Sequence, residues 1–217
     1  MSELFKRVAV AIVGIPLAFF AIYAGGAVLA VAVLIITSLA LWEFYDLARK
    51  KALHPKYPIG LLLNLYFVLF VAFVPASKNM YPIHLISGLA MLVLLALLVE
   101  LFSRKGNPFL NLSALGGGFL YVTLPFTFLI LLRRAGEFFP ESGFSFTLGT
   151  QADDPWGAWM LLTVFVAVWC CDSFAYFFGR AFGKHKLFPR VSPKKSWEGA
   201  VAGFVFAIAA GIGMDAV

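Results

Sequence analysis

An acidic residue lies inside a long apolar run near the C-terminal end of this 217-residue chain. Asp172, followed by Ser173, falls in a stretch that otherwise resembles a membrane-spanning helix, and a carboxylate at that depth costs roughly 2.5–3.5 kcal/mol unless it is paired or faces water. On a helix the same face carries Ala175, Tyr176 and Gly179, where small residues leave room for a ligand or another helix. The carboxylate could bind a divalent cation or hold a lysine that touches phosphate. The alternative is a structural ion pair with a basic residue of the following loop.

Two glycines four residues apart come next, with basic residues interleaved. Gly179 and Gly183 are followed by Arg180 and Lys184, a pattern that lets backbone N–H groups and cations converge on an anion. The alternative is structural, because a glycine often ends a helix and basic residues often follow a membrane span. Both interpretations remain open for this segment.

The segment Ser192–Gly199 predicts the start of a helix that binds an anion. Ser192 is a good N-cap residue, and Pro193 suits the first helical position because its missing N–H costs nothing there. The free amide groups of the first turn, the positive end of the helix dipole and the ammonium groups of Lys194 and Lys195 would then meet at one point. The sequence therefore predicts a phosphate site at this helix start.

Two further side chains belong to the predicted helix start. The Ser196 hydroxyl could donate to the same anion, while Glu198, four residues after Lys194, could hold that lysine or help to bind a metal. The alternative is a basic cap that attracts lipid headgroups without specificity. The Ser-Pro start and the upstream carboxylate favour the specific site.

The elements that position these residues are apolar helices. Hydrophobic residues make up 62% of the chain and charged residues 13%, against about half and about a quarter in a soluble domain, so lipid must be the solvent. The apolar runs are continuous and reach about 20 residues, which indicates helices and not the alternating strands of a barrel. The predicted fold is an all-α, polytopic transmembrane bundle that forms a single domain over residues 1–217, with about seven spans: Val8–Ala24, Ala27–Leu47, Ile59–Pro75, Pro82–Phe102, Ser113–Leu132, Trp156–Phe178 and Ala200–Val217.

The basic residues define one orientation of this bundle. With the N-terminus in the cytoplasm, most of the 17 Lys and Arg residues lie inside, as the positive-inside rule requires. The inside then includes residues 179–198, a cytoplasmic basic loop that carries part of the candidate site, and the predicted location is the inner (plasma) membrane. Topology and anionic lipid headgroups account for the net charge of +6, so no nucleic-acid partner is predicted.

Cysteines and glycines elsewhere predict packing. Cys170 and Cys171 are neighbours on a helix, where their side chains point about 100° apart, so no disulfide is expected between them. The run Gly116–Gly118 lacks the strand and the lysine of a phosphate-binding loop and predicts close helix packing. Small residues of the last span suit either a homodimer interface or packing within one chain: Gly199, Gly203, Gly211 and Gly213.

A resemblance to a known family rests on the same C-terminal segment. The residues DSFAYFFGRAFGKHKL, followed by PRVSPKKSWEGAVAG, are similar to the bacterial phosphatidate cytidylyltransferase family, also called CDP-diacylglycerol synthases. The resemblance implies Mg²⁺-dependent transfer of a cytidylyl group from CTP to phosphatidate, with CDP-diacylglycerol and pyrophosphate as products. It also implies the site residues: catalytic Asp172, Lys194, Lys195 and Ser196, with Asp172 also a metal ligand, and substrate-binding Ser173, Tyr176, Arg180, Lys184, Ser192 and Glu198.

The chain departs from the family pattern at its C-terminal end. Family members carry a further motif with a Lys-Arg pair, a Lys-Asp pair, a Pro-Gly-His-Gly-Gly stretch and paired aspartates that are expected to bind metal, and this motif does not occur here. The chain stops at Val217, inside or just after an apolar span. We therefore expect a truncated chain, derived from an enzyme but inactive by itself.

Two other functions fit the same residues. One is a CTP-dependent lipid kinase that acts on a polyprenol or phytol-like alcohol, and its product would be a phosphorylated lipid instead of a CDP-lipid. The other is a non-catalytic protein that binds or transports anionic lipids with its basic loop. A transporter often contains paired halves with broken spans, and the sequence has no convincing internal repeat.

Overall fold

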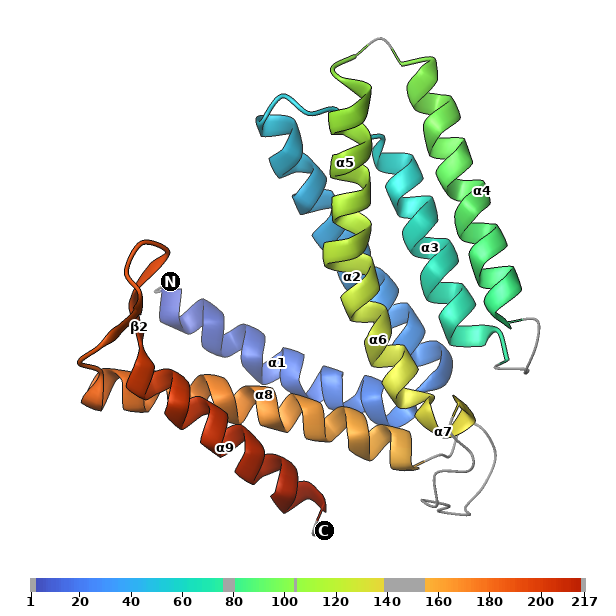
Figure 1. The fold of residues 1–217 in the computed structure, drawn as a ribbon. Helices are drawn as coiled ribbons and strands as arrows, with labels where there is room; N and C mark the ends of the chain where they lie inside the picture. The colour runs from blue at the N-terminus through green and yellow to red at the C-terminus, as the bar shows by residue number, and fades with distance from the viewer. Residues whose placement is uncertain (1–2, 76–80, 104, 139–154, 216–217) are drawn as a thin grey trace. The chain divides into compact units, whose positions relative to one another are not determined.

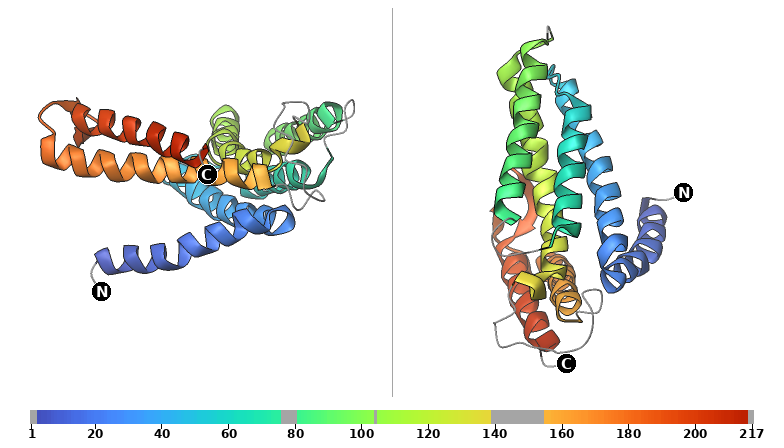
Figure 2. Two further views of the ribbon diagram at one scale, coloured as in Figure 1. Left: turned by 90° about the horizontal axis from the view of Figure 1, so that it is seen from below. Right: turned by 90° about the vertical axis from the view of Figure 1, so that its right-hand side faces the viewer.

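The computed structural model describes residues 3–75, 81–103, 105–138 and 155–215. Helices dominate these residues, and α2 to α6 run side by side (Figures 1 and 2). The elements follow in this order: α1 (Glu3–Ala24), α2 (Gly26–Lys50), α3 (Tyr57–Phe73), α4 (Tyr81–Leu101), α5 (Pro108–Gly118), the π-helical turn η1 (Phe119–Thr123), α6 (Leu124–Arg133), α7 (Ala135–Phe138), α8 (Pro155–Phe182), β1 (Lys186–Phe188), β2 (Ser192–Ser196) and α9 (Trp197–Asp215).

The predicted membrane-type helical architecture is confirmed. Two shorter apolar helices, Ile12–Ala24 and Tyr57–Phe73, coincide with the first and third predicted spans. Within the described ranges, five helical stretches are long and apolar enough to cross a membrane: Gly26–Lys50, Tyr81–Leu101, Pro108–Arg133, Trp156–Phe182 and Trp197–Met214. Each of the predicted runs therefore falls on a helix, with differences of a few residues at the ends.

The chain divides into two compact units, Met1–Ala158 and Trp159–Val217, and the first has its core around Tyr45. Tyr45 is 1% exposed and packs with apolar residues of α2, α3, α4 and α5. A Cβ atom added to Gly118 would lie 2.7 Å from the Tyr45 ring, so a larger residue would push the helices apart. The predicted close packing of Gly116–Gly118 is confirmed at Gly118, whereas Gly116 has no neighbour within 4 Å of an added Cβ.

A buried polar network joins helices of the first unit. Thr123 Oγ1 donates to Asn64 Oδ1 at 3.0 Å, and Asn64 Nδ2 donates to Ser38 Oγ at 3.2 Å. Thr123 ends η1, which lies just before Pro125. Because Pro125 has no N–H to donate to the Tyr121 carbonyl, a regular α-helical bond is lost there, and the wider π turn accommodates the break. The network therefore ties α2, α3 and the irregular span Pro108–Arg133 together.

Two adjacent arginines cap the ends of other helices in this unit. Arg133 is 6% exposed, and its Nε donates to the Ile22 carbonyl oxygen at 3.1 Å near the end of α1. Arg134 donates to the Val74 carbonyl oxygen at 3.1 Å, just past α3, and forms an ion pair with Glu137. The last carbonyl groups of a helix lack partners within the helix, so these arginines stabilise the C-terminal ends of α1 and α3.

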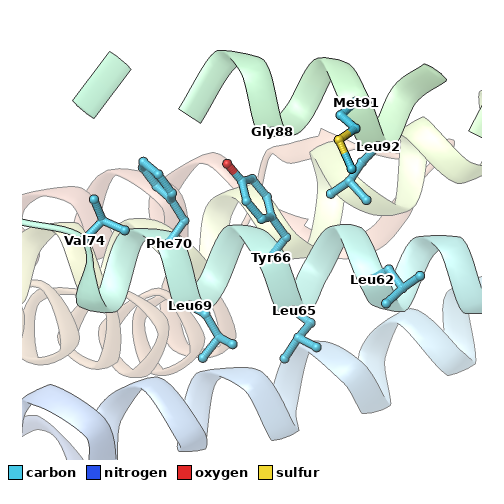
Figure 3. Close-up of a pocket in the computed structure, with 9 residues that line it drawn as sticks. All are labelled: Leu62, Leu65, Tyr66, Leu69, Phe70, Val74, Gly88, Met91 and Leu92. Atoms are coloured by element: carbon cyan, nitrogen blue, oxygen red, sulfur yellow. The ribbon is translucent and has the colours of Figure 1, made fainter. Parts of the chain in front are cut away.

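An apolar groove lies between α3 and α4 (Figure 3). Tyr66 points from α3 towards Gly88 of α4, and its hydroxyl donates to the His84 carbonyl oxygen at 2.8 Å. The groove has a volume of about 560 Å³ and is lined by Leu62, Leu65, Tyr66, Leu69, Phe70, Val74, Gly88, Met91 and Leu92. Such a lining suits a surface whose solvent is hydrocarbon.

The second unit, Trp159–Val217, pairs α8 with α9 through glycines. A Cβ atom on Gly199 would lie 2.6 Å from the Ala175 carbonyl oxygen, and one on Gly203 would lie 2.7 Å from the Cys171 carbonyl oxygen. Only glycine lets the two backbones approach this closely. For Gly199 and Gly203 the structure therefore shows packing within one chain.

Aromatic stacking joins the same two helices, whereas the last glycines of α9 form no close contact of the kind seen at Gly199. Phe174 of α8 stacks on Phe206 of α9, with ring centroids 3.6 Å apart. Cys170 and Cys171 are free thiols, which confirms that no disulfide joins them. Gly211 meets nothing within 4 Å of an added Cβ, and Gly213 behaves in the same way. The last turns of α9 thus lack the close helix contact seen at its start.

Candidate functional site

A short β-hairpin connects α8 to α9 (Figure 1). β1 and β2 are antiparallel, with Lys186 opposite Ser196 and Phe188 opposite Ser192. More residues separate the paired positions in β2 than in β1, so β2 carries a bulge. At the other end of the hairpin, the Val191 N–H donates to the Phe188 carbonyl oxygen at 3.1 Å and closes the turn.

The predicted helix start at Ser192 is wrong. Helix α9 begins at Trp197, and Ser192 and Pro193 lie in β2. A Ser-Pro pair favours a helix start locally, but pairing with β1 outweighs that preference, and Pro193 fits a bulge because it has no N–H for the ladder. The backbone amides of Lys194 and Lys195 therefore belong to a bulged strand and not to the first turn of a helix.

Ser196 caps α9 in place of Ser192. Ser196 is 5% exposed, and its Oγ accepts a hydrogen bond from the Gly199 N–H at 3.3 Å. A Cβ atom on Gly183 would lie 2.6 Å from Ser196 Oγ, and one on Gly179 would lie 3.2 Å from it. The two glycines therefore surround the capping serine and fix the hairpin against the end of α8.

The predicted anion-binding loop from Gly179 to Lys184 is largely helical. Because α8 continues to Phe182, the amides of Gly179 and Arg180 belong to the helix, which favours the structural interpretation of these two residues. Arg180 Nη1 donates to Tyr176 Oη at 3.1 Å, one turn earlier, and both side chains are exposed. The cationic groups of Arg180 and Lys184 therefore remain at the surface, without a cradle of backbone amides.

Asp172 and Ser173 lie in α8 with exposed side chains. Within the part of the chain that the structure describes, Asp172 has no ion pair and no hydrogen bond, so the structural ion pair considered above is not observed. Of the face predicted for Asp172, Ala175 and Gly179 contact Gly199 of α9, whereas the Tyr176 side chain is 59% exposed. Asp172 precedes the hairpin contact at Gly179 by two helical turns, or about 10 Å along the axis.

A histidine without a predicted role joins the site. His185 donates its backbone N–H to both carboxylate oxygens of Glu198, at 3.2 and 3.3 Å, and its Nδ1 lies 2.7 Å from Glu198 Oε1. The Trp197 N–H donates to the His185 carbonyl oxygen at 2.9 Å. Glu198 therefore holds His185 at the base of the hairpin. Its spacing from Lys194 had suggested that lysine as the partner instead.

An open hollow with a volume of about 990 Å³ lies beside this pair. The side-chain ammonium groups of Lys184 and Lys186 have no hydrogen-bond or ion-pair partner among the described residues, and Lys194 and Lys195 are exposed in the bulge. Charged residues from the base of the hairpin and apolar residues of α9 together line the hollow: Lys184, His185, Lys186, Trp197, Glu198, Val201 and Ala202.

Magnesium binding would rest on one carboxylate of this segment. Among the residues with described positions, no three His, Cys, Asp or Glu side chains come together as a metal site. Mg²⁺ is commonly held by one or two carboxylates together with substrate phosphates and water. An exposed carboxylate such as that of Asp172 could serve as one protein ligand in such a set.

One protein family and several known proteins are similar to this sequence. A family model described as the cytidylyltransferase family matches residues 5–217. A phosphatidate cytidylyltransferase of Haemophilus influenzae is 32% identical over 187 residues, which cover 80% of this chain and 59% of that protein. The Bacillus subtilis protein of the same name is 25% identical over 211 residues, covering 96% of this chain and 70% of that protein. The Brucella abortus protein is 38% identical over 92 residues, covering 39% of this chain and 34% of that protein. The chain thus spans less than two thirds of the Haemophilus and Brucella proteins.

Proposed function

Because this chain belongs to the cytidylyltransferase family, we propose that the complete protein transfers a cytidylyl group from CTP to phosphatidate in the membrane. The relatives reported above carry the name phosphatidate cytidylyltransferase. The observation that carries the proposal is the set of exposed cations on the hairpin where α8 and α9, two candidate membrane spans, pack together. Such a place suits a reaction between a lipid phosphate and a water-soluble triphosphate.

The chemistry requires positioning and charge neutralisation more than proton transfer. A phosphate monoester has its second pKa at about 6, so the lipid phosphate is largely dianionic at neutral pH and needs no general base. One phosphate oxygen attacks the α-phosphorus of CTP, and a new P–O bond forms. The bond from the α-phosphorus to the bridging oxygen breaks, and pyrophosphate leaves with that electron pair. Two anions must be held in line while negative charge grows on the leaving group.

The bulge of β2 supplies the proposed contacts for the triphosphate. Lys194 and Lys195 would neutralise the charge that develops on the leaving pyrophosphate, a role for which preorganised cations are effective. The Ser192 hydroxyl would donate to a phosphate oxygen. Ser196, which we predicted to be catalytic, would act by holding the bulge against α8 and α9, because its hydroxyl is buried at the helix cap.

Residues of α8 and of its C-terminal end would complete the site. Mg²⁺, when bound, would lower the charge repulsion between the phosphates, and Asp172 would be its ligand from this segment. Arg180 and Lys184 would attract phosphate groups at the membrane surface. Ser173 and Tyr176 remain proposed substrate contacts on the exposed part of α8.

We place this site on the cytoplasmic side of the inner membrane. The positive-inside distribution supports that orientation, which lets CTP arrive from the cytosol while the diacyl chains of phosphatidate stay in the lipid. Membrane lipids are then partners as well as solvent. A homodimer through the last turns of α9, where Gly211 and Gly213 have no close neighbours in the chain, is part of the same proposal.

A radiolabel assay tests the proposed reaction. With CTP and phosphatidate in detergent micelles, the full-length protein should form CDP-diacylglycerol, and Lys195→Ala should lower kcat/KM about 100-fold because a charge contact to the leaving group is lost. The control Lys51→Ala removes an exposed lysine from the end of α2 and should retain wild-type turnover.

Two outcomes would contradict the proposal. Normal turnover by Lys195→Ala would remove this lysine from the mechanism. A phosphorylated lipid without any CDP-lipid would identify a CTP-dependent lipid kinase instead. Circular dichroism and the elution volume of Lys195→Ala should match those of the wild type, so that a loss of turnover does not reflect misfolding.

A further inference from the structure

The hollow beside His185 has two chemically different walls. Lys184 and Lys186 lie on either side of His185 at the base of the hairpin and form a cationic wall. Trp197 and Val201, one helical turn apart on α9, form an apolar wall, and both side chains are more than half exposed. A ligand that fills the hollow must therefore combine an anionic part with an apolar part.

The charge of the hollow favours an anion. Glu198 is the acidic residue of the lining, but its carboxylate accepts hydrogen bonds from His185 and is only 28% exposed. The ammonium groups of Lys184 and Lys186 have no such partner in the described parts of the chain. The lining carries two lysines against one carboxylate, so it keeps a net positive charge and would attract a phosphate group.

The position of the hollow at the start of α9 indicates which of the two substrates, the lipid or the nucleotide, it suits better. The candidate membrane span begins at Trp197, so the apolar wall continues along the span while the cationic wall belongs to the hairpin that precedes it. A phosphate joined to an acyl chain matches both walls. A free triphosphate matches only the cationic wall, and it can be met by Lys194 and Lys195, which do not line the hollow.

We propose that this hollow binds the phosphate head and the upper acyl chain of phosphatidate. The inference rests on the proposed function and assigns the lipid substrate to a wall distinct from the lysines of the bulge. The volume of about 990 Å³ is sufficient for a phosphate, a glycerol unit and several methylene groups. Lys186 then binds the lipid phosphate, and Val201 contacts the acyl chain.

Separate KM values for the two substrates test this assignment in the full-length protein. Lys186→Gln should raise the KM for phosphatidate about tenfold, because one charge-assisted hydrogen bond is lost, and should leave the KM for CTP unchanged. Val201→Ser should raise the KM for long-chain phosphatidate and leave that for a dihexanoyl analogue unchanged. Arg190→Gln removes the same charge from the turn of the hairpin, outside the hollow, and should change neither value.

Two results would overturn the assignment. One is a change in the KM for CTP alone in Lys186→Gln, which would make the hollow a nucleotide site. The other is an equal effect of Arg190→Gln and Lys186→Gln on phosphatidate, which would indicate attraction by net charge and no specific pocket.

Binding without turnover separates this inference from the proposed function. Radiolabelled phosphatidate in mixed micelles, without CTP, should bind the wild type about tenfold more tightly than Lys186→Gln, and excess inorganic phosphate should displace it only weakly, because phosphate lacks the acyl chain. If the wild type makes no CDP-lipid but shows this difference, the proposed function fails and the lipid site stands. Equal binding by wild type and Lys186→Gln overturns the site, whatever the turnover.

Discussion

Glu198 is the residue on which the geometry of the hairpin base depends. Its carboxylate accepts the backbone N–H of His185 and lies 2.7 Å from the Nδ1 of the same histidine, where the chain enters β1. An ionised acceptor makes stronger hydrogen bonds than a neutral one, so this side chain fixes the path of the backbone between Lys184 and Lys186. Glu198 therefore orders the chain at His185, between Lys184 and Lys186, and its predicted contact with substrate stays a prediction.

Removal of this carboxylate should loosen the hairpin. We expect trypsin to cut Glu198→Ala several-fold faster than the wild type after the basic residues of the hairpin, because local opening exposes the backbone to the protease. Glu198→Gln keeps an acceptor oxygen and should give an intermediate rate. Glu43→Ala, which removes an exposed carboxylate from α2, is the control. Identical cleavage of Glu198→Ala and the wild type would show that the contact contributes nothing to hairpin order.

At the scale of elements, glycines determine how closely α8 and α9 approach. An added methyl group at Gly199 would meet the Ala175 carbonyl oxygen at 2.6 Å and the Gly179 Cα at 2.9 Å, and both are backbone atoms that cannot rotate away. At Gly211 of the same helix, the added methyl group meets nothing within 4 Å. The same substitution thus has opposite consequences at two ends of one helix.

We expect Gly199→Ala to destabilise the helix pair by about 1–3 kcal/mol, since overpacking moves the backbones apart. Within a single chain, Gly211→Ala should instead stabilise α9 by about 0.5–1 kcal/mol, because alanine has the higher helix propensity and meets no neighbour there. Unfolding by sodium dodecyl sulfate, followed by circular dichroism in mixed micelles, measures both values. A stability for Gly199→Ala equal to or above that of Gly211→Ala would refute the close packing.

The elements differ in how well the sequence predicts them. Long apolar runs locate the helices, because a bilayer admits few alternatives to a helix of about 20 residues. The hairpin escapes prediction because Ser192 and Pro193 carry a local helix-start signal that strand pairing overrides. His185 and Glu198 meet through the fold of the hairpin, and no helical or strand periodicity connects them. The roles of Lys194, Lys195 and Asp172 stay predictions, since the structure gives their places and not their ligands.

At the scale of the whole molecule, the buried polar network and the candidate chemistry lie in different units. The buried polar network and the arginine caps lie in Met1–Ala158, whereas the hairpin, the exposed cations and Asp172 lie in Trp159–Val217. A multi-spanning helical protein needs hydrogen bonds and close packing between its helices, because lipid provides no hydrophobic drive for them to associate. The first unit supplies such contacts through Asn64 and Thr123.

This division predicts a substitution that lowers stability and leaves turnover intact. Asn64→Leu deprives Thr123 Oγ1 and Ser38 Oγ of their partner at a fully buried site, so the free energy of unfolding should fall by about 0.5–2 kcal/mol. Below the unfolding transition, both KM values and kcat should equal those of the wild type, because the proposed site residues lie in the second unit. Leu65→Met, an exposed position on the same helix, should change neither property. A fall in kcat for folded Asn64→Leu would mean that the first unit takes part in the reaction, because stability alone does not alter the turnover of folded molecules.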